Sequence, residues 1–281
     1  LAAWVVFLGS TGQAQSLPDP KPFVVFDGTL YSNKPDLSLY GIQPISIAYA
    51  GKFGPDWHKH ADRLPTAESV KAVALEMQNK GRLVVVDIEH WPLKGPLDLV
   101  RNSVTKFITV LELFRAAAPG LYLGYYGAPP IREYWRAIKD PSNQEHKSWI
   151  AENDQIRSLA GAVDVYFPSL YTFYPDQEGW KKYALAQIKE ARRYGNGKPV
   201  YVFLWPQYHE SNRLLGGSFL PEDYWLVELE TAKQYADGIV VWGGWGSNNR
   251  PARWDDKAPW WTATKEFMKR IQPSQPADGT H

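Results

Sequence analysis

The sequence predicts an α/β fold, a closed β/α barrel of about seven parallel strands. Short apolar runs alternate along the chain with longer segments of helical periodicity, which is the order that strand-helix repeats produce. The runs are almost continuously apolar, as is typical of parallel strands covered on both faces. A doubly wound sheet is the alternative, but no glycine-rich phosphate loop follows the first run. A chain of 281 residues has an ordinary length for one such barrel.

Seven apolar runs are the predicted strands. They are FVVFDG (23–28), ISIAYA (45–50), LVVVDIE (83–89), LYLGYYG (121–127), VDVYFPSLY (163–171), PVYVFLW (199–205) and GIVVWGGW (238–245). The first helix is expected from Thr66, because the apolar residues over 70–77 follow helical spacing. Further helices are predicted at about 100–114, 148–160, 178–194, 221–236 and 258–270.

The first residues of the chain predict an exported protein whose signal peptide is removed. Residues 1–14 resemble part of a signal peptide, because an apolar run precedes the small residues Gly12-Gln13-Ala14. The run is too short for a stable membrane anchor, so we expect a secreted or periplasmic protein that is free of the membrane after processing. Residues 15–272 are predicted to form one barrel domain and 273–281 a polar tail. The lack of cysteine and of N-x-Ser/Thr sequons favours a bacterial protein stabilised by its core.

The composition narrows the possible partners. There are 31 basic and 30 acidic side chains, so the net charge is +1 and no nucleic-acid partner is expected. Thirteen Trp and 16 Tyr supply flat rings with polar edges, which suit sugar faces but also commonly fill cores. No nucleotide motif or metal-ligand spacing is present. We therefore predict no cofactor and no metal, and we expect a monomer.

Acids and aromatic rings gather at the carboxyl ends of the predicted strands, where a β/α barrel carries its functional groups. Asp87 and Glu89 are two residues apart, so on a strand both point to one face with Cα atoms about 7 Å apart. Two such carboxylates hinder each other's ionisation, so one keeps its proton to higher pH and can act as a general acid. The alternative is a solvated pair of acids at the rim of a strand.

DIEHW (87–91) resembles the D-W-E-x-W-R-P motif of the hyaluronidases, glycoside hydrolase family 56. Further similar segments follow in the family's order along nearly the whole chain. They are KPFVVFDGTLY (21–31), YGIQPISIAYAGKFG (40–54), LYLGYYGAPP (121–130), FPSLY (167–171), PVYVFLWPQY (199–208), GSFLPEDYWLVE (217–228) and GIVVWGGW (238–245). The resemblance implies a distorted, TIM-like barrel with seven strands and a glycosidase that acts on a polysaccharide or oligosaccharide.

The resemblance also implies the roles of single residues. Glu89 matches the general acid, and Asp87 matches the acid that orients the substrate's N-acetyl group. In that mechanism the amide oxygen of the substrate attacks the anomeric carbon, and configuration is retained. The predicted substrate-binding residues are Tyr171, Tyr208, Trp242, Tyr126, Asp27 and Trp91. The first three match the aromatic residues around the N-acetyl group.

The chain departs from the family pattern beside the two acids. Ile88 replaces the Trp between them, no Arg precedes Pro92, and residues 128–132 replace the family's P-D-C-Y-N segment. These changes bear on the identity of the substrate. We predict a retaining glycoside hydrolase that cleaves at an N-acetylhexosamine. The alternatives are a glycosidase for non-acetylated glycans with a carboxylate from another strand, such as Asp27, or a carbohydrate-binding barrel without activity.

Overall fold

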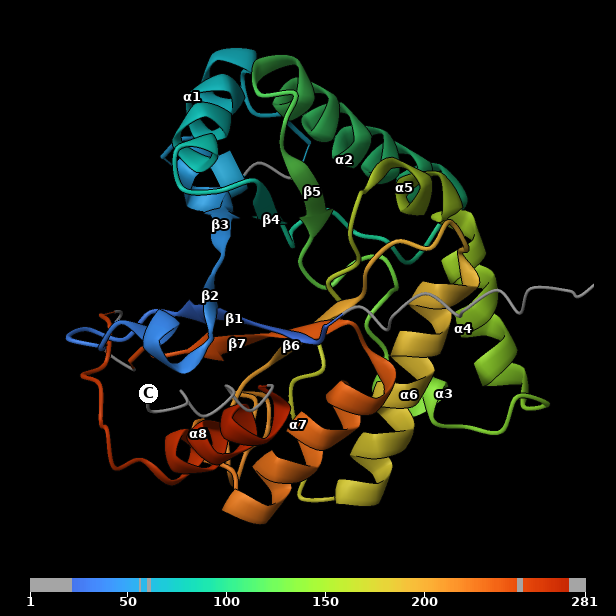
Figure 1. Ribbon diagram of the computed structural model, residues 1–281. Helices are drawn as coiled ribbons and strands as arrows, with labels where there is room; N and C mark the ends of the chain where they lie inside the picture. The colour runs from blue at the N-terminus through green and yellow to red at the C-terminus, as the bar shows by residue number, and fades with distance from the viewer. Residues whose placement is uncertain (1–21, 56, 60–61, 247–249, 273–281) are drawn as a thin grey trace, which may run out of the picture.

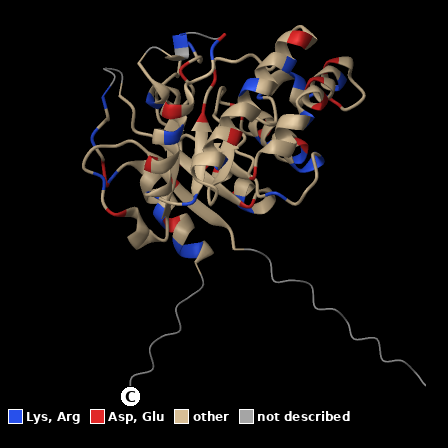
Figure 2. Ribbon diagram, turned by 90° about the horizontal axis from the view of Figure 1, so that it is seen from above, with Lys and Arg blue, Asp and Glu red and all other residues tan. Residues whose placement is uncertain are grey.

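The structure is a computed structural model that describes residues 22–55, 57–59, 62–246 and 250–272. The predicted signal segment 1–14 and tail 273–281 lie outside the described residues. Within the described ranges, no helix has both the length and the apolar character needed to cross a membrane. Acidic and basic residues are mixed on the outer helices (Figure 2).

Parallel strands form the centre of the molecule in two sheets. The strands are β1 (Val24–Thr29), β2 (Gln43–Pro44), β3 (Ser46–Tyr49), β4 (Leu83–Asp87), β5 (Tyr122–Tyr125), β6 (Tyr201–Leu204) and β7 (Gly238–Gly243). One sheet has the order β2-β1-β7-β6 and the other the order β3-β4-β5, and every pairing is parallel. The predicted class, a distorted barrel of about seven parallel strands, is confirmed.

Two stretches of chain join the sheets. Residues 43–49 pass from one sheet to the other, because β2 pairs with β1 and β3 pairs with β4. The predicted strand 163–171 forms only isolated bridges, which link it to Tyr126 on one side and to Val200 and Phe203 on the other. Pro168 interrupts that stretch, since it has no N–H to donate to a ladder. The barrel is therefore distorted at these two places.

Helices cover the outside of both sheets. They are α1 (Ala67–Gln78), α2 (Leu97–Ala117), α3 (Tyr134–Ala137), α4 (Gln144–Gln155), α5 (Arg157–Ala162), α6 (Gln177–Arg193), α7 (Glu222–Tyr235) and α8 (Pro259–Ile271), with short 3-10 turns η1 (Leu37–Tyr40), η2 (Ala50–Phe53) and η3 (Trp57–Lys59). Figure 1 shows α1 and α2 outside the three-stranded sheet, and α7 and α8 outside the four-stranded sheet. The helix predicted at 148–160 is divided at Ile156 into α4 and α5, and α3 was not predicted.

Alternation along the strands separates two layers of core. Phe26, Val85 and Val240 point into the barrel and belong to an interior cluster. Their neighbours Val25 and Val241 point outward and pack in the larger layer between strands and helices. An inward-facing residue at the carboxyl end of a strand therefore reaches the mouth of the barrel, and this rule positions the site.

Candidate active site

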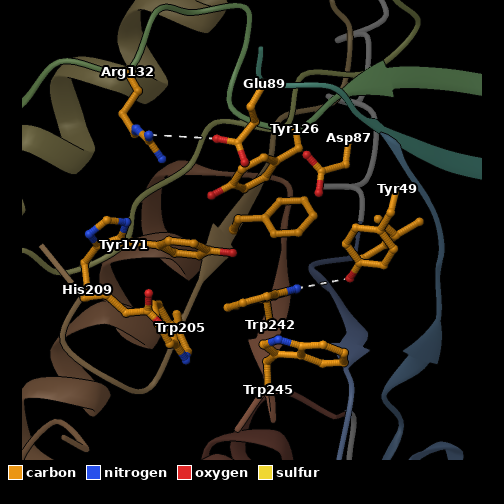
Figure 3. Close-up of a pocket in the computed structure, with 13 residues that line it drawn as sticks. Tyr49, Asp87, Glu89, Tyr126, Arg132, Tyr171, Trp205, His209, Trp242 and Trp245 are labelled. Atoms are coloured by element: carbon orange, nitrogen blue, oxygen red, sulfur yellow. Dashed lines mark hydrogen bonds and ion pairs between the residues drawn. The ribbon is translucent and has the colours of Figure 1, made fainter. Parts of the chain in front are cut away.

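A pocket with a cavity volume of about 280 Å³ opens at the carboxyl ends of the strands (Figure 3). The lining residues are Ile47, Tyr49, Asp87, Glu89, Tyr126, Arg132, Tyr171, Phe203, Trp205, His209, Glu210, Trp242 and Trp245. They supply three carboxyl groups, one guanidinium group and seven aromatic rings besides an imidazole. A concave site with apolar rings and a few converging polar groups is the usual form of a small-molecule or saccharide site.

Asp87 is the last residue of β4 and faces inward, in step with Val85 two residues earlier. Burial, and to a smaller extent the negative charge of Glu89, raise the pKa of Asp87 to about 7. Among the described residues, none donates a hydrogen bond to this carboxyl group. A buried carboxyl group with open acceptor atoms in a pocket is a candidate for a functional role.

Glu89 reaches the same pocket from beyond the end of β4. Its side chain is 55% exposed, and its Oε2 lies 3.9 Å from Nη2 of Arg132, which is longer than a hydrogen bond. The prediction that both acids point inward along one strand is therefore correct only for Asp87, because the strand ends before Glu89. The group with the raised pKa is Asp87, whereas the resemblance assigns the role of general acid to Glu89.

Three aromatic rings form a packed floor opposite the acids (Figure 3). Tyr171 stacks on Trp242 with 5.7 Å between ring centroids. Trp205 packs edge-on against both, at 5.4 Å and 5.1 Å. Nε1 of Trp242 donates a hydrogen bond of 3.1 Å to the hydroxyl of Tyr49. Because each ring is held by another, the floor presents fixed apolar faces to a bound molecule.

The tyrosine hydroxyls around the pocket are neutral groups. Burial raises the pKa of Tyr49 and of Tyr126 to about 12, and it raises the pKa of Tyr171 well above its ordinary value. The hydroxyl of Tyr126 also shares a hydrogen bond of 3.0 Å with Oγ of Ser169. These phenols can donate hydrogen bonds to a ligand at neutral pH.

The loop after β6 contributes an imidazole and a third carboxyl group. Burial, followed by the nearby charge of Arg132, lowers the pKa of His209 below its ordinary value of 6.5, so the ring is neutral at pH 7. Glu210 is exposed and lines the pocket as well. Neither residue was predicted from the sequence as part of the site.

Five of the eight predicted site residues line the pocket together, namely Asp87, Glu89, Tyr126, Tyr171 and Trp242. Asp27 does not. It alternates with the inward-facing Phe26 and so points away from the barrel interior. Its carboxyl oxygens bind Lys34 at 2.5 Å and the Thr29 hydroxyl at 2.6 Å. This side chain is fully occupied by contacts outside the pocket.

Tyr208 and Trp91 also lie outside this lining. Tyr208 is buried in the outer layer and packs edge-on against Tyr224 of α7 at 6.3 Å, while Trp205 occupies the inward position at the end of β6. Trp91 is buried against Phe107 at 5.0 Å. It follows the end of β4 and lines a neighbouring hollow instead.

Tyr49 is the main pocket residue that the sequence did not predict, and Trp205 was expected at a strand end without a substrate-binding role. Each lies two residues after an inward-facing apolar residue, Ile47 or Phe203, so alternation was the signal that could have identified them. Arg132 lies in a segment that was noted for its departure from the family pattern, and it is the one guanidinium group in the described lining.

Two further hollows adjoin the pocket. The first shares Glu89, Tyr126 and Arg132 with it and extends along Trp91. The second shares Trp205, Glu210 and Trp245 and extends over the loop after β6. The binding surface at the mouth of the barrel is thus longer than the pocket itself.

No cluster of three or more metal-binding side chains occurs in the described part of the chain.

Neither a protein-family model nor a curated protein matches the chain by sequence.

Solved structures are similar in fold. Two crystal structures of bee venom hyaluronidase, one in complex with a hyaluronic acid tetramer, have TM-scores of 0.60 at 16% and 17% identity. The first alignment covers 88% of this chain and 97% of the other, and the second covers 89% and 96%. At these identities the likeness shows the barrel fold.

Proposed function

We propose that this protein is a glycoside hydrolase that cleaves next to an N-acetylhexosamine and retains configuration through substrate assistance. The observation that carries the proposal is the buried Asp87 carboxyl group beside Glu89, inside a pocket of fixed aromatic rings. Rings of this kind bind the apolar faces of sugars, and two adjacent acids suit cleavage of a glycosidic bond. A distant relation to the hyaluronidases, with which the chain shares a fold, is part of the proposal.

Glu89 acts as the acid and then as the base. It donates its proton to the glycosidic oxygen as the bond from that oxygen to the anomeric carbon breaks. In the second step its carboxylate accepts a proton from the water that attacks the anomeric carbon. Its exposed position beyond β4 and its long contact with Arg132 leave an oxygen available to a leaving group.

Asp87 orients the acetamido group of the substrate. Its carboxylate accepts the amide N–H, so the amide oxygen faces the anomeric carbon and attacks it as the glycosidic bond breaks. The resulting oxazolinium ring is positively charged. A carboxylate whose pKa is raised by burial gains more from that nearby positive charge than a solvated one would, so it stabilises the transition state more than the bound substrate.

A second candidate is a glycosidase for non-acetylated glycans. Its nucleophile or base would be a carboxylate from another strand, and Glu210 lines the pocket from the loop after β6. Asp27 does not suit this role, because Lys34 and Thr29 occupy its oxygens. Glu210 therefore replaces Asp27 in this alternative.

The experiment compares matched substrates. The wild-type protein, Glu89→Gln and Asp87→Asn are incubated with N-acetylated chitooligosaccharides, hyaluronan oligosaccharides and de-N-acetylated chitooligosaccharides, and reducing ends are counted. We expect cleavage of an N-acetylated substrate only, and severe loss in both variants. Cleavage of the de-N-acetylated substrate alone would support the Glu210 alternative, and full activity of Glu89→Gln would refute the proposed mechanism. Binding without cleavage by the wild type would indicate a carbohydrate-binding barrel.

A further inference from the structure

Two exposed aromatic side chains lie in contact on the face that carries the pocket. Trp135 belongs to α3, in the loop after β5, and Tyr174 follows the bridging stretch 163–172. Their side chains are 56% and 37% exposed. Both segments leave the carboxyl ends of barrel strands, as the pocket residues do. Contiguous exposed apolar surface of this kind is a candidate interaction site.

The two rings are held in a fixed arrangement. Their centroids are 5.0 Å apart, and Nε1 of Trp135 donates a hydrogen bond of 3.2 Å to the hydroxyl of Tyr174. Tyr134, which is buried, packs against both rings at 5.1 Å. The Tyr174 hydroxyl still has its own proton to donate. A ligand thus meets a flat apolar surface with one hydrogen-bond donor, and little side-chain entropy is lost on binding.

Several charged side chains next to the pair neutralise one another, and the carboxylate of Asp176 accepts a hydrogen bond from the backbone N–H of Gly179. Arg136 contacts Glu152 at 2.7 Å and Glu133 at 3.0 Å, and Glu133 also contacts Lys94 at 3.1 Å. The surface around the rings therefore suits an uncharged molecule with an apolar face and hydroxyl edges. A pyranose ring has this character.

A series of ring contacts connects the pair with the pocket. His209 of the pocket lies 4.8 Å from Phe173, Phe173 lies 6.3 Å from Tyr174, and Tyr174 contacts Trp135. The pair is thus two ring contacts away from the pocket wall, which a few linked sugar residues can span. A chain whose reacting sugar sits between Asp87 and Glu89 can extend to it.

We propose that Trp135 and Tyr174 form an outer saccharide-binding subsite, on which a sugar of a long glycan stacks while the same chain occupies the pocket. This rests on the proposed function and adds that the substrate is a polymer rather than a short oligosaccharide.

The test measures long and short substrates side by side. For the wild type, Trp135→Ala and Trp135→Phe, kcat/KM is determined with glycol chitin or hyaluronan, whichever is cleaved, and with the corresponding tetrasaccharide. We expect a loss of about tenfold on the polymer in Trp135→Ala, a smaller loss in Trp135→Phe, and a change below twofold on the tetrasaccharide. Tyr122→Ala is the matched control, because Tyr122 is 52% exposed but begins β5 at the opposite end of the barrel.

Binding separates this inference from the proposed function. Affinity electrophoresis of Glu89→Gln, with and without Trp135→Ala, measures retention by each polymer without turnover. Weaker retention on removal of Trp135 supports the subsite even if the wild type cleaves nothing, in which case only the proposed hydrolysis fails. Equal losses on polymer and tetrasaccharide, unchanged retention, or no retention of Glu89→Gln by either polymer would overturn the subsite.

Discussion

The two walls of the pocket differ in what they offer a bound sugar. The β4 wall, Asp87 and Glu89, supplies two carboxyl groups from a single strand end, one of them buried. The β6 wall, Trp205, His209 and Glu210, supplies ring faces, a neutral imidazole and one exposed acid. Under the proposed function, bond-making and bond-breaking belong to the β4 wall, and the β6 wall holds the substrate.

The largest expected effect comes from removing the proton donor of the β4 wall. Glu89→Gln should lower kcat about 10³-fold with a small change in KM, because a positioned acid contributes on the order of 10²–10⁴ to the rate. Steady-state kinetics on an N-acetylated oligosaccharide measure this. Glu178→Gln, at an exposed site on α6, serves as the control and should match the wild type. A fall in kcat of less than tenfold in Glu89→Gln would show that Glu89 is not the general acid.

Asp87→Asn should change the pH dependence of stability. The unfolded chain releases the Asp87 proton near pH 3.8 and the folded chain near pH 7, so between these values the folded state binds more protons and wild-type stability falls as pH rises. At about 1.36 kcal/mol per pH unit, full ionisation costs at most on the order of 4 kcal/mol. Asparagine does not ionise, so Asp87→Asn removes this destabilisation at high pH. The two proteins should unfold alike at pH 4, and the variant should be more stable at pH 8, as urea titrations measure.

If the free energies of unfolding of the two proteins changed in parallel from pH 4 to pH 8, burial would not destabilise the ionised form of Asp87. The variant would then also be a poorer test of the electrostatic role proposed for this carboxylate. Loss of activity together with gain of stability at pH 8 is the combination expected of a functional buried acid.

Tyr171 and Tyr208 were both matched to family residues, but only Tyr171 lines the pocket. Tyr171→Phe should lower kcat/KM about tenfold, since its hydroxyl lies in the pocket. Tyr208→Phe should stay within twofold, because Tyr208 packs against Tyr224 in the outer layer. Kinetics of both variants on one substrate test this, and equal losses would place Tyr208 in the site after all.

The smallest effect is expected for Tyr49→Phe. The change removes the acceptor of the Trp242 Nε1 hydrogen bond and leaves the ring in place. A hydrogen bond of this kind contributes about 1 kcal/mol, so KM should rise a few-fold while kcat changes little. A large fall in kcat would instead assign the Tyr49 hydroxyl a part in the reaction itself.

Alternation explains what the sequence could and could not predict. Runs such as FVVFDG and PVYVFLW are apolar on both faces, because helices cover the outside and side chains fill the inside. Their hydrophobicity therefore does not reveal which residues face inward, so Asp27 and Tyr208 were chosen where Tyr49 and Trp205 line the pocket. Asp87 was expected at a strand end and lines the pocket. Asp27 also follows four apolar residues, but it lies inside β1, which continues to Thr29.

The exact ends of strands were also not predictable from the sequence. Glu89 was expected on the strand, but β4 ends at Asp87, and the loop places Glu89 beside Arg132. The contact between them joins residues 43 positions apart in the sequence, and no local pattern encodes it. The bridging stretch 163–171 was likewise predicted as a strand, although Pro168 prevents a regular ladder.

The proposed mechanism takes both of its carboxyl groups, the acid Glu89 and the orienting Asp87, from the β4 wall. This origin can be tested by kinetics. It is tested most directly by measuring kcat/KM of Asp87→Asn and Glu210→Gln on the same N-acetylated oligosaccharide. We expect a loss of about 10²-fold or more for Asp87→Asn and a change within threefold for Glu210→Gln. Near-normal activity of Asp87→Asn together with loss of activity in Glu210→Gln would refute this mechanism and place the second functional carboxylate on the β6 wall.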